Sequence, residues 1–138
     1  MSTIVVGVDG SDTAAQAAST AAGLAAALGA GLHVVCAFPT SAPVGTTAEG
    51  PSSRDTAEEL ASTTAGALRS AYPDLAVTAD AEPGKPAEAL VQAATDAAAT
   101  LIVIGNKRVQ GVSRILGSVA VDVVRKAPCD VYIAHTTG

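Results

Sequence analysis

The chain has 138 residues, about the size of one domain and enough to bury a core without disulfides or metals. Of these residues 49% are apolar but only 2% are aromatic, so alanine, valine and leucine must build the core. The net charge of −5 argues against a general nucleic-acid-binding protein, which needs a basic face. No apolar run approaches the ~20 residues that span a bilayer, and no basic leader precedes the first strand. We therefore expect a cytoplasmic protein without nucleic-acid or membrane partners.

The first half of the chain predicts two buried strands around an alanine-rich helix. Residues 4–8 are mainly β-branched, which is typical of a strand buried on both faces. Turn and cap residues at 9–12 begin a helix that runs to Leu28, and Gly29 takes the place of the glycine that ends a helix. Residues 32–38 form the second strand. The apolar stripe expected on the helix consists of Ala14, Ala17, Ala21, Leu24 and Leu28.

A long loop and a second helix follow. Residues 39–53 are rich in Pro, Gly, Ser and Thr and are too many for an ordinary connection, so we predict a mobile lid or a disordered loop. Asp55 and Glu58 then resemble a capping box, with Asp55 in the cap position. The helix ends before Tyr72. Its predicted buried residues are Leu60, Thr64, Ala67, Leu68 and Ala71.

The second half continues the alternation. Residues 76–81 predict an edge strand, and residues 101–105, the most hydrophobic strand, should be central. Between them a helix begins at Pro86 and runs through Ala98. A last helix covers 117–126 and a last strand 131–135. The residues expected to be buried by the helix at Pro86 are Ala89, Leu90, Ala93, Ala94 and Ala97.

This alternation predicts an α/β fold, a single domain over residues 1–138 with a five-stranded parallel sheet and helices on both faces. Right-handed crossovers favour the strand order 3-2-1-4-5, which places the topological switch between strands one and four. Ligands of such sheets bind at the switch, outside the carboxyl ends of the strands. Asp9 follows strand one and Gly105 ends strand four, so both lie there.

The segment from Gly105 to Ser118 carries most of the functional information. Its glycines at 105 and 117 let backbone approach a ligand, and free N–H groups at the start of the next helix suit a phosphate. Lys107, Arg108 and Arg114 add positive charge to an otherwise acidic chain. The alternative is an ordinary glycine-containing surface loop with basic residues. The segment is neither a Walker A motif nor a dinucleotide fingerprint.

Asp9 has two interpretations that its position leaves open. The carboxylate can cap the first helix together with Ser11 and Asp12, which is the commoner role. It can also accept hydrogen bonds from a ribose or an adenine edge.

The histidines and cysteines suggest no chemistry. His33 lies inside a strand and His135 has no acidic or thiol partner in sequence, so we expect no metal site. Cys36 and Cys129 have the spacing of neither a redox pair nor a zinc site, and we expect reduced thiols. No nucleophile with a base and an acid can be assembled, so we expect the protein not to be an enzyme.

The chain resembles the universal stress protein family over its whole length. The resemblance is carried by residues 4–11, 102–106 and 117–119 and by the closing stretch 127–131. The ATP-binding branch of that family carries Gly-x2-Gly-x9-Gly-Ser/Thr. Gly105 matches the first glycine, and Gly117 with Ser118 matches the last pair. Arg108 replaces the second glycine, and the loop is one residue shorter. The Arg108 guanidinium either binds the phosphates or fills their space.

The resemblance implies an adenine nucleotide ligand and a regulatory or stress-response role. The ligand would be ATP, accompanied by Mg²⁺, or alternatively cyclic AMP or ADP. It also implies a homodimer through the last strand, from Val131 to His135, and an exposed edge strand supports this independently. The alternatives are a dimerisation or adaptor protein whose site Arg108 blocks, and a slow ATPase. The implied nucleotide-binding residues are Val8, Asp9, Ala37, Gly105, Asn106, Arg108, Gly117, Ser118 and Val119.

Overall fold

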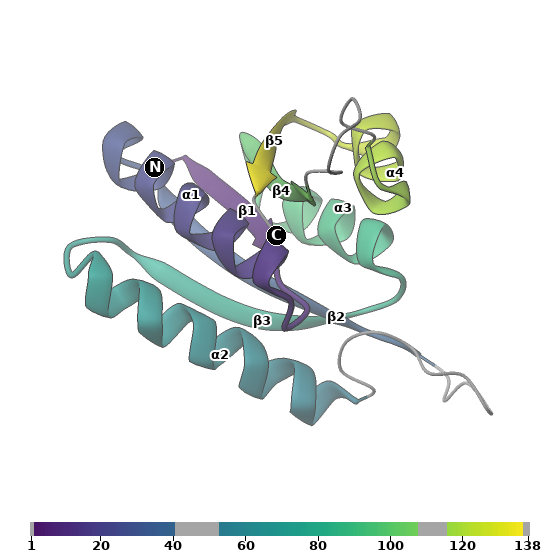
Figure 1. The fold of residues 1–138 in the computed structure, drawn as a ribbon, viewed down its shortest axis with the longest axis horizontal. Coiled ribbons are helices and arrows are strands. Elements are labelled where there is room, and N and C mark those ends of the chain that lie inside the picture. The colour runs from purple at the N-terminus through teal and green to yellow at the C-terminus, as the bar shows by residue number, and fades with distance from the viewer. Residues whose placement is uncertain (1, 41–52, 108–115, 137–138) are drawn as a thin grey trace.

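The computed structural model describes residues 2–40, 53–107 and 116–136, and these form a parallel sheet covered by helices on both faces (Figure 1). The five strands lie in the order β3-β2-β1-β4-β5, which confirms the predicted fold class. β1 is the middle strand, and β4 is an interior strand rather than the central one. In chain order the elements are β1 Thr3–Gly7, α1 Asp12–Leu28, β2 Gly31–Phe38, α2 Arg54–Ala71, β3 Val77–Pro83, α3 Pro86–Asp96, β4 Leu101–Lys107, α4 Ser118–Lys126 and β5 Asp130–Thr136.

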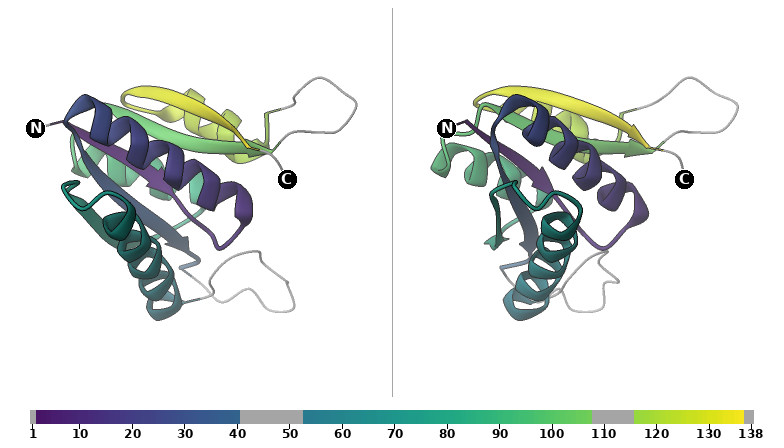
Figure 2. Two further views of the ribbon diagram at one scale, coloured as in Figure 1. Left: turned by 60° about the vertical axis from the view of Figure 1, so that its left-hand side comes forward. Right: turned by 90° about the vertical axis from the view of Figure 1, so that its left-hand side faces the viewer.

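Each interior strand is apolar on both faces, which is what two covering helix layers require. On β1, Ile4 and Val6 pack into the cluster formed with α1 and α2, whereas Val5 packs into the cluster formed with α3 and α4. α2 and β5 lie at opposite ends of the twisted sheet (Figure 2). From the carboxyl end of β1 the chain continues to α1 on one face of the sheet, and from the carboxyl end of β4 it continues to α4 on the other face. This divergence creates the topological switch.

α1 packs its alanines directly on the sheet. The buried residues Ala17, Ala21 and Ala25 repeat every four positions, and their small side chains let the helix approach the strands closely. The helix ends where predicted, with Gly29 in the left-handed conformation at φ 67°. The expected burial of Leu28 is wrong, because 67% of its surface is exposed. After Gly29 turns the chain, Ala30 occupies the buried position instead and donates its N–H to the Ala25 carbonyl.

α2 begins earlier than predicted. Ser53 is its N-cap, because the Ser53 side-chain oxygen accepts a hydrogen bond from the Thr56 N–H at 3.3 Å, and Asp55 lies in the first turn. The buried stripe is also rotated relative to the prediction. Ala67 and Ala71 are exposed, Leu60 and Thr64 are half-buried, and Leu68 is buried as expected. The residues that reach the sheet are Ala57, Ala61, Ala65 and Leu68.

The remaining elements follow the prediction with shifted ends. β3 is an edge strand, as expected, and α3 starts at Pro86. α3 ends at Asp96 rather than Ala98, because Ala98 adopts a φ of 50° that a helix does not allow, and Ala97 is only half-buried. Within the described ranges, no helix has the length and apolar content needed to cross a bilayer. The predicted lid over residues 39–53 falls largely outside the described residues.

Candidate functional site

A cavity of about 310 Å³ opens at the carboxyl ends of β1 and β4. It contains five of the residues predicted from the sequence, which come from four separate segments of the chain: Val8, Asp9, Ala37, Gly105 and Val119. Leu90 and Pro86, both on α3, form an apolar part of the cavity wall. The topology therefore brings together residues more than a hundred positions apart, as expected for a ligand site at a topological switch.

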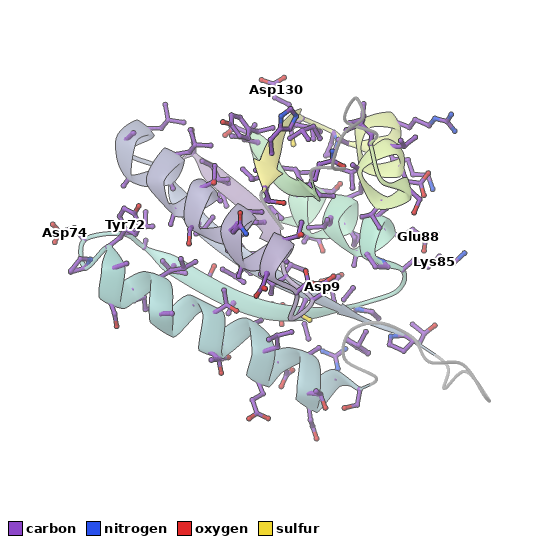
Figure 3. The ribbon with its side chains drawn as sticks, viewed as in Figure 1. Asp9, Tyr72, Asp74, Lys85, Glu88 and Asp130 are labelled. Atoms are coloured by element: carbon purple, nitrogen blue, oxygen red, sulfur yellow. The ribbon has the colours of Figure 1, made fainter. Side chains whose placement is uncertain are left out.

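Asp9 holds the turn that precedes α1 and also borders the cavity. Its Oδ1 accepts a hydrogen bond from the Ser11 N–H at 2.9 Å, and the Ser11 hydroxyl accepts one from the Ala14 N–H at 3.2 Å. Figure 3 shows Asp9 at the turn that leads into α1. The N-cap of α1 is therefore Ser11, and Asp9 orders the turn before the helix instead of capping it. Asp9 also lines the cavity, where it can reach a ligand. Its contact with a ribose or a base stays a prediction.

Gly105 has a structural role that the sequence did not reveal. A Cβ at this position would lie 2.8 Å from the Thr13 carbonyl oxygen and 3.2 Å from the Ala17 Cβ, so a side chain would collide with α1. The glycine therefore lets α1 lie directly on β4, in addition to bordering the cavity. At Gly117, by contrast, an added Cβ meets none of the described residues within 4 Å, so among these residues nothing crowds the start of α4.

The start of α4 offers donors to an anion. Gly117 is the N-cap and has no side chain to cap the helix, so the first-turn N–H groups of Ser118 and Val119 have no helical partner. The positive end of the α4 dipole also attracts an anion to these N–H groups. Val119 lines the cavity, whereas Ser118 is exposed and Gly117 lies beside the cavity rather than in it.

Asn106 joins the end of β4 to the start of α4. Its side-chain Oδ1 accepts a hydrogen bond from the Gly117 N–H at 3.1 Å, across eleven positions of sequence. Only 4% of the residue is exposed, and it does not line the cavity. The family resemblance implied that Asn106 binds the ligand, but nothing in the sequence indicated this tether. Arg108, the remaining predicted site residue, lies outside the described residues.

The α3 wall was not foreseen as part of the site. The periodicity placed Leu90 and Ala89 in the core, where both are indeed buried, but nothing in sequence showed that they also face a cavity. Pro86 was recognised only as the start of a helix. The signal that could have found them is positional, because α3 begins at the same edge of the sheet at which β1 ends.

Burial shifts the pKa values of two titratable groups on β2. Burial, with a smaller contribution from the Asp9 carboxylate, raises the pKa of the Cys36 thiol to about 11, so the thiol stays protonated. Burial lowers the pKa of His33, partly opposed by Asp80, and its ring Nδ1 lies 2.6 Å from the Thr78 hydroxyl. Both cysteines are free thiols, and no cluster of metal-ligating side chains occurs in the described parts of the chain.

A second hollow, of about 450 Å³, lies at the opposite edge of the sheet. It is lined by the carboxyl ends of α1 and α2 and by the segment with Tyr72 and Asp74, which Figure 3 shows far from Asp9. Although it is larger, it lies at the amino ends of the strands and faces the negative ends of two helix dipoles. The cavity beside Asp9 is therefore the better candidate for an anionic ligand.

These features define a doubly wound α/β domain with a ligand cavity at the switch between β1 and β4. The family model described as "Universal stress protein family" matches residues 1–135, and the chain belongs to this family. A 55-residue stretch is 46% identical to the universal stress protein Rv1636 of Mycobacterium tuberculosis, and it spans 39% of this chain and 38% of that protein.

Solved structures extend the similarity over nearly the whole chain. The crystal structure of Rv1636 is 31% identical, covers 99% of this chain and 96% of its own, and superposes with a TM-score of 0.60. A universal stress protein in complex with cAMP is 29% identical over 98% of this chain and 97% of its own, with a TM-score of 0.74. One from Archaeoglobus fulgidus in complex with dAMP is 26% identical over 96% of this chain and 97% of its own, with a TM-score of 0.71.

Proposed function

We propose that this universal stress protein binds ATP or a related adenine nucleotide at the switch between β1 and β4 and acts as a regulatory, stress-response module. The cavity beside Asp9 and Gly105 is the observation that carries the proposal. Its walls are apolar at Leu90 and Pro86, and a carboxylate stands at its edge, which suits a flat base and a hydroxylated sugar.

The size of the cavity indicates which part of a nucleotide would lie inside it and which part outside. Its 310 Å³ lies at the lower end of the usual range for ligand pockets, about 300–1,000 Å³. We therefore place the nucleoside inside it and the phosphates outside, against the open N–H groups at the start of α4. Since no metal-ligating cluster occurs among the described residues, Mg²⁺ would arrive with ATP, held mainly by its phosphates.

Two structural relatives support adenine as the common feature of the ligand. One is described in complex with cAMP and the other in complex with dAMP, and both ligands carry adenine and a single phosphate. Their phosphates differ, one cyclic and one open, and so do their sugars, ribose in one and deoxyribose in the other, so adenine is what a shared site would recognise. ATP, ADP and cyclic AMP all remain candidates for this chain.

Calorimetric titration with ATP, ADP and cyclic AMP, with GTP for comparison, tests the proposal. We expect saturable heat for at least one adenine nucleotide and weaker binding of GTP. Ala37→Leu places a larger side chain on the cavity wall and should weaken binding, whereas the same change at Ala67, exposed on α2, should not. Flat titrations for all three adenine nucleotides would leave the adaptor alternative, in which Arg108 occupies the site.

We propose that the protein is not an enzyme beyond slow ATP hydrolysis. The carboxylate at the cavity, Asp9, already accepts a hydrogen bond from the Ser11 N–H in the turn before α1. A general base would have to be free to take a proton from water. Phosphate release measured with saturating ATP should be slow, and rapid turnover that depends on Asp9 would contradict this.

We also propose a cytoplasmic homodimer that pairs through β5. β5 is an edge strand of the sheet, and 44% of Tyr132 and 51% of Val124 on the adjacent α4 are exposed. An edge with exposed apolar side chains is normally paired or covered. The two free thiols fit a reducing compartment. Light scattering should give a dimer, and Tyr132→Glu should convert it to a monomer, whereas an unchanged monomer mass for the wild type would exclude this interface.

A further inference from the structure

β3 lies at the end of the sheet opposite β5, so one side of its backbone has no neighbouring strand. The Ala76 carbonyl accepts a hydrogen bond from the Leu32 N–H of β2, and the Gly84 N–H donates one to the Phe38 carbonyl of β2. Because residues alternate along a parallel pair, the even-numbered residues between them direct their backbone groups to β2, and the odd-numbered residues direct theirs away from the sheet. The outward residues are Val77, Ala79, Ala81 and Pro83.

The side chain of Arg69, in the last turn of α2, covers the first of these outward groups. Its Nε and Nη2 donate hydrogen bonds to the Val77 carbonyl oxygen at 3.2 and 2.7 Å. α2 packs on one face of β3 (Figure 1), so a side chain in its last turn can reach the start of the strand. Hydrogen bonds from a charged donor are among the strong ones, and an incoming strand would have to displace this one to pair with the Val77 carbonyl.

Two further positions along the edge offer no free donor. The Asp80 Oδ1 accepts a hydrogen bond from the Ala81 N–H at 2.9 Å, and Pro83 has no N–H to give. Among the four outward residues, Ala79 alone is left with both groups unpaired in the described ranges. A second copy that paired antiparallel about the middle of β3 would also bring two Asp80 carboxylates together, and like charges opposite each other destabilise a strand pair.

We propose that Arg69 and Asp80 close the β3 edge to strand addition and so limit the self-association of this protein through its sheet to the other edge. Open edges on both sides would let each copy join two others, and such contacts give open-ended assemblies when they do not form a ring. With β3 closed, a second copy of the chain can extend the sheet only at β5. The inference depends neither on the nucleotide site nor on whether β5 pairs.

The variant Arg69→Ala/Asp80→Ala opens the edge without changing the net charge, because it removes one positive and one negative side chain. In sedimentation velocity at increasing protein concentration, we expect its mass to reach at least about twice that of the wild type, since each new β3 contact joins two wild-type units. Arg54→Ala/Asp55→Ala is the matched control, because it removes the same two kinds of side chain from exposed positions in the first turn of α2. Its mass should equal that of the wild type.

Hydrogen exchange tests the Asp80 contact directly. The Ala81 N–H should exchange about tenfold or more faster in Asp80→Ala than in the wild type, because a hydrogen bond to a charged acceptor is lost. The comparison is made at a concentration at which both proteins have the same mass. The Val8 N–H, which donates to the Val35 carbonyl of β2 at 2.9 Å, is the internal reference and should exchange equally in both proteins. Since Asp80 is exposed, this single variant should keep the fold, and at higher concentration its mass should also rise above that of the wild type.

The results separate this inference from the proposed homodimer. A wild-type monomer whose double variant dimerises supports the closed edge, and so does a wild-type dimer whose double variant grows into larger assemblies. A double variant that is folded by circular dichroism and keeps the wild-type mass refutes the closed edge, whatever that mass is. If the double variant unfolds, an unchanged mass of Asp80→Ala refutes it instead. Equal exchange of the Ala81 N–H in the two proteins would refute the contact with Asp80.

Discussion

Gly105→Ala should destabilise the protein even though alanine is normally the better residue in a strand. The added Cβ would lie 2.8 Å from the Thr13 carbonyl oxygen and 2.9 Å from the Thr13 Cγ2. The carbonyl belongs to the first turn of α1, so it cannot move without displacing the helix from the sheet. The substitution therefore acts on the contact that sets the distance between α1 and β4.

The magnitude follows from two opposing effects. Forcing an extra methyl group into a packed contact costs about 1–3 kcal/mol. Because the collision is with a backbone atom, the cost lies in the upper half of that range. Alanine in place of glycine restricts the unfolded chain, which stabilises the folded state by about 0.5–1 kcal/mol. The net loss should be about 1–2.5 kcal/mol, which for a domain of this size lowers the Tm by roughly 3–10 °C.

Urea denaturation followed by circular dichroism measures this loss, with Gly66→Ala as the matched control. Gly66 lies inside α2, where an added Cβ meets none of the described residues within 4 Å, so the same substitution should raise stability by about 0.5–1 kcal/mol. We thus predict that the glycine-to-alanine change lowers the free energy of unfolding at Gly105 and raises it at Gly66. If Gly105→Ala is neutral or stabilising, α1 does not pack on β4 as closely as the structure shows.

Three further predictions concern single side chains. Gly117→Ser should keep the fold intact, since serine is a better N-cap than glycine, but should weaken ATP binding in calorimetry because its hydroxyl occupies the donors at the start of α4. Ser53→Ala removes the acceptor for the Thr56 N–H and should cost about 1 kcal/mol in urea denaturation with an unchanged m-value. Burial lowers the pKa of His33, so the unfolded chain binds the proton more readily, and stability should fall as the pH drops below the ordinary value of 6.5. Urea midpoints above and below that pH should differ less in His33→Gln than in the wild type, and equal differences would exclude His33 as the cause.

The topology could be predicted from the sequence because strands and helices carry different residue types. β-branched runs alternate with alanine-rich segments, and a parallel sheet with right-handed crossovers then allows few arrangements. The helix faces were harder, because alanine occurs on both sides of a helix. Ala61 is buried whereas Ala67 and Ala71 are exposed, and a methyl side chain gives too weak a periodic signal to distinguish them.

The candidate site was predictable to the extent that it depends on strand ends. Asp9 and Gly105 were expected at the switch, and the cavity contains both. The Asn106 tether depends on a contact with Gly117 that only the folded chain creates, and local sequence patterns do not describe such contacts. The same is true of Gly105, whose missing side chain makes room for Thr13 from a different part of the chain.

The most direct measurement is a crystal structure of the protein grown with ATP. We predict density for adenosine in the cavity between the ends of β1 and β4, bordered by Asp9 and Gly105, with the phosphates at Gly117. A nucleotide bound elsewhere on the protein, or this cavity filled by one of the chain's own side chains at saturating ATP, would contradict the account.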